Sequence, residues 1–158
     1  MNNIKSKRVT LRKIRREEVS EYFQIAYDEE IKKFLPYAYC ENFEEAEYFL
    51  ESMVDNTKTS GELGIVNEDD KLVGVITYER NIKDMYELNF FIGQNFRKKG
   101  YALESITALI GRLSKEGELT KYIMACKYGN VASKELIKKL GGKRIQVLNN
   151  NEYEIFRI

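Results

Sequence analysis

The residues of this chain best suited to chemistry form a basic loop, Arg97-Lys98-Lys99-Gly100-Tyr101-Ala102. An apolar stretch precedes it and apolar residues at helical spacing follow it, so the pattern predicts a strand, this loop and then a helix. The first N–H groups of a helix have no partner inside the helix and carry the positive end of its dipole. Such a place binds a phosphate or pyrophosphate. Gly100 allows close approach of the main chain, and Arg97, Lys98 and Lys99 add positive charge.

Acid–base chemistry in this chain must use carboxylates, lysine, tyrosine, cysteine or water, because the sequence contains no histidine. Catalytic sites of the Ser-His-Asp and Cys-His types are therefore excluded, as are the histidine-containing zinc sites of hydrolases. The two cysteines, Cys40 and Cys126, are too few for a disulfide framework. We expect Cys126 to act as a small buried apolar residue.

Length and composition predict one globular domain that spans residues 1–158, with 43% hydrophobic residues. The net charge of +1 gives no signal for nucleic-acid binding. No apolar run reaches the length of a membrane span, and no leading segment looks like a signal peptide. We therefore expect a cytoplasmic monomer or homodimer without nucleic-acid or membrane partners.

Hydrophobic periodicity predicts a mixed α/β chain that positions this loop between a strand and a helix. The expected helices cover 15–28, 42–55, 100–115 and 130–140. The expected strands, about seven in number, cover 8–14, 61–67, 71–80, 84–93, 119–126, 143–148 and 153–158.

The R-x-x-G-x-A pattern of the basic loop resembles motif A of the GNAT superfamily of acyl-CoA-dependent N-acetyltransferases. Downstream, Asn130, Ser133 and Lys139-Leu140-Gly141 resemble motif B of the same superfamily. The resemblance covers nearly the whole chain and is strongest to the branch that includes the ribosomal-protein alanine N-acetyltransferases. Two positions depart from the pattern: Gly142 replaces the usual Phe, and Ile137 replaces a tyrosine that several branches use as general acid.

This resemblance implies the GNAT fold, a central mixed and mostly antiparallel sheet with helices on both faces. In that fold the strands at 84–93 and 119–126 run parallel and splay apart, and the gap holds the pantetheine arm of acetyl-CoA. A gap in a sheet leaves backbone groups unpaired, and the amides of a ligand can pair with them.

Acetyl-CoA is thus the implied cosubstrate, and no metal is expected. Besides the residues of the basic loop, the resemblance assigns Phe91, Ile92 and Asn130 to cofactor binding. The backbone N–H of Phe91 or Ile92 is the expected donor to the thioester carbonyl. Tyr101 is expected to pack over the cofactor.

Two side chains are candidates for catalysis. Glu87, on the strand before motif A, is the candidate general base; the alternative is a strand-surface glutamate paired to a neighbouring Arg or Lys. Ser133 is the candidate proton donor to the leaving thiolate; the alternative is that Asn130 and Ser133 only cap their helix. Glu104, in the G-Y-A-x-E sequence, is expected to orient its helix or line the acceptor floor.

The expected activity is transfer of acetyl from acetyl-CoA to a primary amine by direct attack in a ternary complex. The acceptor is a protein or peptide N-terminus or a small amine, and the sequence does not name it. Alternatives are a small-molecule or antibiotic acetyltransferase, a non-catalytic acyl-CoA-binding module and, more remotely, a nucleic-acid-binding protein.

Overall fold

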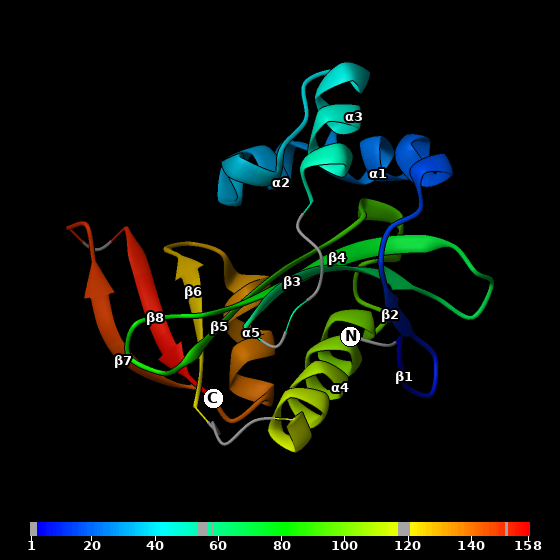
Figure 1. Cartoon of the computed structure of the whole chain (residues 1–158). Coiled ribbons are helices and arrows are strands. Elements are labelled where there is room, and N and C mark those ends of the chain that lie inside the picture. Colours follow the sequence, from blue (N-terminus) through cyan, green and yellow to red (C-terminus); the bar gives the residue numbers. More distant parts are fainter. Residues whose placement is uncertain (1–2, 54–56, 58, 117–120, 151) are drawn as a thin grey trace.

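A mixed sheet of eight strands forms the centre of the structure (Figure 1). The computed structural model describes residues 3–53, 57, 59–116, 121–150 and 152–158. Within them the strand order is β1-β2-β3-β4-β5-β6-β8-β7, and every neighbouring pair is antiparallel except β5–β6. The expected mixed sheet is confirmed. The strands are β1 Ile4–Lys5, β2 Thr10–Arg12, β3 Ser60–Val66, β4 Leu72–Arg80, β5 Tyr86–Ile92, β6 Tyr122–Lys127, β7 Lys143–Leu148 and β8 Tyr153–Arg157.

Helices cover both faces of this sheet, as Figure 1 shows. One face packs under α1 (Val19–Ala26), α2 (Glu29–Phe34) and α3 (Phe43–Ser52), with Phe91 of β5 in that apolar cluster. The opposite face packs under α4 (Tyr101–Glu116) and α5 (Val131–Lys139), in a second cluster. None of the described helices has both the length and the apolar character needed to cross a membrane.

The N-terminal third differs from the expected elements. The expected strand 8–14 is shorter, and it pairs with β1, which was not expected. The expected helix 15–28 is wrong in extent, because a 3-10 turn (Arg16–Glu18) precedes α1 and a second helix, α2, begins after Asp28. Asp28 causes this break, since its carboxylate accepts hydrogen bonds from the first N–H groups of α2. Residues 54–55, 119–120 and 151 of other expected elements lie outside the described part.

The parallel pair separates after a short contact. Only Tyr86↔Tyr122 and Glu87↔Ile123 pair between β5 and β6, whereas β6 pairs with β8 along its whole length. The rings of Tyr86 and Tyr122 stack with centroids 5.9 Å apart, and this contact stabilises the end where β5 and β6 still pair. Beyond Glu87 and Ile123 the facing edges of the two strands have no strand partner among the described residues, which confirms the expected splay.

Candidate active site

The free edge of β5 offers backbone donors, and the alternation of a strand shows which ones. The N–H of Tyr86 donates toward the β6 side at 3.0 Å, whereas the N–H of Gly93 donates to the carbonyl of Val73 in β4 at 2.8 Å. Since these directions alternate along a strand, Phe91 shares the direction of Gly93 and Ile92 shares that of Tyr86. Of the two expected carbonyl donors, Ile92 therefore has its N–H on the open edge, and Phe91 uses its N–H within the sheet.

The basic loop between β5 and α4 has the backbone shape of an anion cradle. Lys98 (φ 59°) and Gly100 (φ 83°) lie in the left-handed region on either side of Lys99. Alternation of this kind turns successive N–H groups toward one side. Among the described residues, no group accepts a hydrogen bond from the N–H groups of residues 100–103, at the start of α4. These donors, with exposed Lys98 and Lys99, fit a phosphate ligand.

Arg97, the first residue of the motif, is directed away from this cradle. Its Nε donates to the carbonyl oxygen of Ile92 at 3.0 Å, and its two terminal nitrogens lie 3.1 Å from Asp28 and 2.9 Å from Glu30. The guanidinium is thus committed to protein partners. Positive side-chain charge at the loop comes from Lys98 and Lys99.

Arg8 supports the same loop from the β1–β2 hairpin, and sequence reasoning missed it. Its Nη1 donates to the carbonyl of Lys99 at 2.8 Å, and its guanidinium lies 5.2 Å from the centre of the Tyr101 ring. Its backbone N–H and Nε both donate to Glu104, at 2.6 and 2.9 Å. Burial raises the pKa of Glu104, but the hydrogen bonds from Arg8 and Ser6 lower it to below its usual value. Glu104 therefore orients α4, and the residue pattern around Arg8 gave no signal for this contact.

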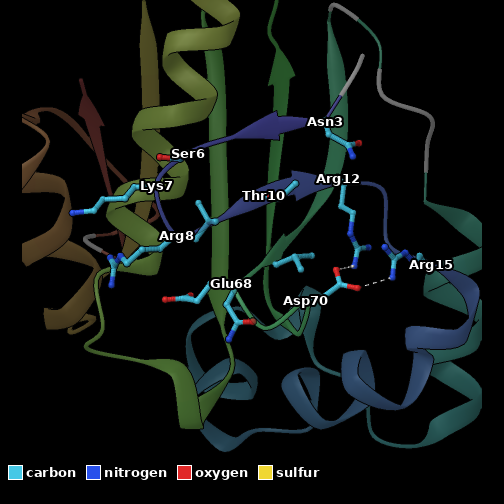
Figure 2. A pocket seen from close by; sticks show the side chains of 12 residues that line it. Asn3, Ser6, Lys7, Arg8, Thr10, Arg12, Arg15, Glu68 and Asp70 are labelled. Carbon is cyan, nitrogen blue, oxygen red and sulfur yellow. Dashed lines mark hydrogen bonds and ion pairs between the residues drawn. The ribbon is translucent and has the colours of Figure 1, made fainter.

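A hollow of about 320 Å³ lies beside Arg8, between the β1–β2 hairpin and the β3–β4 turn (Figure 2). Its lining includes Lys7 and three arginines, and each arginine has a carboxylate partner. Arg12 and Arg15 both contact Asp70, as the dashed lines in Figure 2 show, and Arg12 also pairs with buried Glu18. The charges of these arginines are therefore balanced within the protein.

Glu87 lies where the β5–β6 pairing ends. By strand alternation its side chain is on the same face as Phe91, beneath α1–α3. No described residue forms an ion pair or hydrogen bond with its carboxylate, and its register partner on β4 is another carboxylate, Glu79. The alternative expectation was a glutamate paired to a neighbouring Arg or Lys. Among the described residues, no Arg or Lys pairs with Glu87.

Tyr37 also belongs to this neighbourhood, and the sequence did not single it out. It lies on the 3-10 turn Pro36–Ala38 that follows α2, with 60% of its surface exposed. Desolvation by the surrounding protein, then the charge of Glu87 and the nearby Tyr153, raise the pKa of Tyr37 to about 12. The phenol is therefore protonated at neutral pH and can donate a hydrogen bond beside Glu87.

The second motif forms the turn from β6 into α5. Asn130 caps α5, and its Oδ1 accepts the N–H of Ser133 at 3.2 Å. The expected helix cap is thus confirmed for the Asn130 side chain. Ser133 contributes only its backbone N–H to the cap. The Cys126 thiol donates to the carbonyl oxygens of Lys127 and Asn130, each at 3.5 Å. Burial raises the pKa of Cys126, and the Ser133 side chain lowers it in part. Cys126 is 3% exposed, as expected for a small buried residue.

The two departures from motif B pack against each other. A Cβ at Gly142 would lie 2.8 Å from the carbonyl oxygen of Ile137 and still closer to its side chain. Ile137 is fully buried. A glycine at 142 therefore makes room for the residue that replaces tyrosine at 137, and α5 offers no phenol at that place.

A metal centre has no candidate in the described ranges, where no three His, Cys, Asp or Glu side chains gather closely enough to hold an ion.

The chain is similar in sequence and in fold to known acetyltransferases. A family model described as an acetyltransferase (GNAT) domain matches residues 8–143. The uncharacterized N-acetyltransferase YnaD of Bacillus subtilis (strain 168) is 24% identical over 143 residues, 90% of this chain and 83% of that protein. An acetyltransferase of the GNAT family from Bacillus anthracis superposes with a TM-score of 0.86 at 22% identity, over 99% of this chain and 98% of that one. The ribosomal-protein α-N-acetyltransferase RimL, solved in complex with coenzyme A, gives 0.85 at 14% identity, over 99% and 97%.

Proposed function

Because the chain belongs to the GNAT family of acetyltransferases, we propose that it transfers the acetyl group of acetyl-CoA to a primary amine by direct attack in a ternary complex. The observation that carries this proposal is the splay of β5 and β6 directly before a loop whose N–H groups are free. One strand edge and one anion cradle, adjacent in the chain, match the two parts of an acyl-CoA molecule, its amide-bearing arm and its phosphates.

The residues present fit acetyl-CoA. The N–H groups at the start of α4, with Lys98, Lys99 and Gly100, would hold its phosphates, and the backbone near Ile92 would pair with its arm. Tyr101 and Ala102 stand at the helix start, and Tyr101 keeps the loop in place through Arg8 over its ring. RimL, a protein of the same fold, was solved in complex with coenzyme A, which supports coenzyme A as the ligand. The bound thioester supplies an activated acyl group, and the chain supplies its orientation.

On the acceptor side, the carboxylates of Glu79 and Glu87 attract an ammonium group, because neither has a described cation partner. An amine must lose its proton before it can attack, and Glu87, where the β5–β6 pairing ends, is a group that can accept it, directly or through water. Tyr37, protonated and close by, can hold the acceptor or that water by a hydrogen bond. The N–H of Ile92 stabilises the oxyanion.

The leaving thiolate gains a proton or a hydrogen bond from Ser133. This hydroxyl lies in the first turn of α5, directly after the open end of β6 that borders the gap. Position 137 offers no alternative acid, since Ile137 is buried and apolar.

A panel of amines tests the proposal. Peptides with free N-terminal alanine or serine, their Nα-acetylated counterparts and small diamines are each mixed with acetyl-CoA, and thiol release is followed. We expect release that depends on a free primary amine. Acetyl-CoA binding without release for any member of the panel would support the non-catalytic acyl-CoA-binding module instead.

A further inference from the structure

The short helix α2 is held at its two ends by cations that come from the two splayed strands. Arg97, just beyond β5, contacts Asp28 and Glu30 at the start of α2. Lys127, the last residue of β6, donates from Nζ to the carbonyl oxygen of Lys33 at 3.1 Å, near the end of α2. Figure 1 shows α2 over the arrowhead of β6. The helix therefore bridges the open ends of β5 and β6.

Asp28 is the centre of the first attachment. Its side chain is only 7% exposed, and Oδ1 accepts the N–H groups of Glu30 and Ile31 at 2.9 and 3.1 Å as the cap of α2. The same oxygen meets Arg97, whose Nε holds the carbonyl of Ile92. One residue thus connects the helix start to the end of β5.

These polar contacts determine where α2 lies. A helix of six residues has little stability of its own. Ile31 is its single buried residue. The position of α2 in turn fixes Tyr37, which follows on the next turn and lies near Glu87 and Tyr153.

We propose that Asp28, Arg97 and Lys127 are positioning residues that make α2 a strap, meaning the segment 28–34 fastened across the open ends of β5 and β6. The separation of the two strands then sets the place of α2, and through it the place of Tyr37 on the 3-10 turn that follows. This inference rests on the proposed function, in which the acetyl-CoA arm occupies the gap. Occupation of the gap fixes both strand ends and so orders the strap.

Hydrogen exchange, with and without acetyl-CoA, tests this coupling without any need for the acceptor. In the unmodified protein, acetyl-CoA should slow exchange both at the start of α4 and in α2. Asp28→Asn keeps a good cap but removes the charge that Arg97 meets. Lys127→Met keeps the chain length but removes the bond to Lys33. In each variant α4 should stay protected, and the protection of α2 by acetyl-CoA should fall about tenfold, as for one charged hydrogen bond.

Two controls separate the strap from general destabilisation. Arg16→Gln removes an exposed ion pair with Glu51 on the same side of the sheet and should leave the coupling intact. Lys127→Arg retains a donor at the end of β6 and should restore the protection that Lys127→Met loses.

The outcomes are distinct. If acetyl-CoA protects α4 but not α2 in the unmodified protein, or if both variants keep full protection of α2, the strap is overturned while the proposed function stands. If acetyl-CoA protects neither helix, cofactor binding itself fails, and the inference fails with it.

Discussion

Replacement of Gly100 by alanine tests whether the backbone of the basic loop forms the anion site. Gly100 has φ 83°, a region that costs other residues roughly 1–2 kcal/mol. The added Cβ would lie 3.0 Å from Nη2 of Arg8, the movable end of a long side chain, so the steric part is small. Because the loop is exposed, it can relax in the free protein, and the strain then returns when an anion must be bound. A strain of about 1.4 kcal/mol corresponds to tenfold weaker acetyl-CoA binding.

Gly141→Ala is the matched control. Gly141 has nearly the same angle, φ 80°, and a Cβ there meets nothing within 4 Å, but it lies at the end of α5, far along the chain from the loop. We expect little change in thermal unfolding for Gly100→Ala, because its loop relaxes in the free protein. Only Gly100→Ala should weaken acetyl-CoA in calorimetry. Equal affinities for the two variants would refute the backbone-cradle reasoning and leave lysine charge as the source of binding.

The remaining predictions concern catalysis and stability. Glu87→Gln should lower turnover about a hundredfold with acetyl-CoA affinity kept, in steady-state kinetics and calorimetry; full activity at neutral pH would leave Glu87 structural. Ser133→Ala should lower turnover roughly tenfold, about 1.4 kcal/mol of barrier, with unchanged melting because Asn130 supplies the cap; a melting shift with normal turnover would contradict the donor role. Glu18→Gln should cost about 3 kcal/mol in denaturant unfolding, because it leaves buried Arg12 without its closest partner, 2.6 Å away; a loss near zero would show that Asp70 compensates.

Glu18 also predicts how the stability of the fold changes at acidic pH. Burial raises the pKa of Glu18, but hydrogen bonds from Arg12 and the N–H of Arg15 outweigh it, so the pKa in the folded state lies below the ordinary value of 4.5. The stabilisation is therefore complete above the pKa of the unfolded chain and is lost as pH falls through the lower, folded value. Unfolding of Glu18→Gln should show less loss of stability than the parent protein on acidification below 4.5. Parallel pH curves for the two proteins would contradict the assignment.

Sequence patterns predicted the sheet and its site well where hydrophobic periodicity was long. Strands β3 to β5 and the helix after the loop agree with expectation to within a few residues, because each buries a continuous apolar face. The two-residue strand β1 and the six-residue helix α2 were missed, since neither is long enough for a period to appear. For α2 a signal existed in Asp28 followed by two glutamates, with lysines in the last turn.

Roles within the site were harder to predict because they depend on contacts distant in sequence. The motif suggested that Arg97 meets phosphate, but its guanidinium contacts Asp28 and Glu30, nearly seventy positions away along the chain (separations of 69 and 67). Arg8 reaches the loop from the other end of the chain, and no local pattern marks it. Tyr37 lies beside Glu87 only because the fold brings a connector over β5.

The central claim is that acetyl moves from acetyl-CoA to an amine in one step within a ternary complex. Mass spectrometry of the whole reaction tests it most directly, with the protein, the amine and the released coenzyme A measured in one mixture. Direct transfer predicts one acetylated amine for each thiol released, and no acetylated protein when acetyl-CoA is present without amine. Acetylated protein that forms without amine and disappears when amine is added would contradict direct transfer, and thiol release without acetylated amine would contradict the transferase assignment itself.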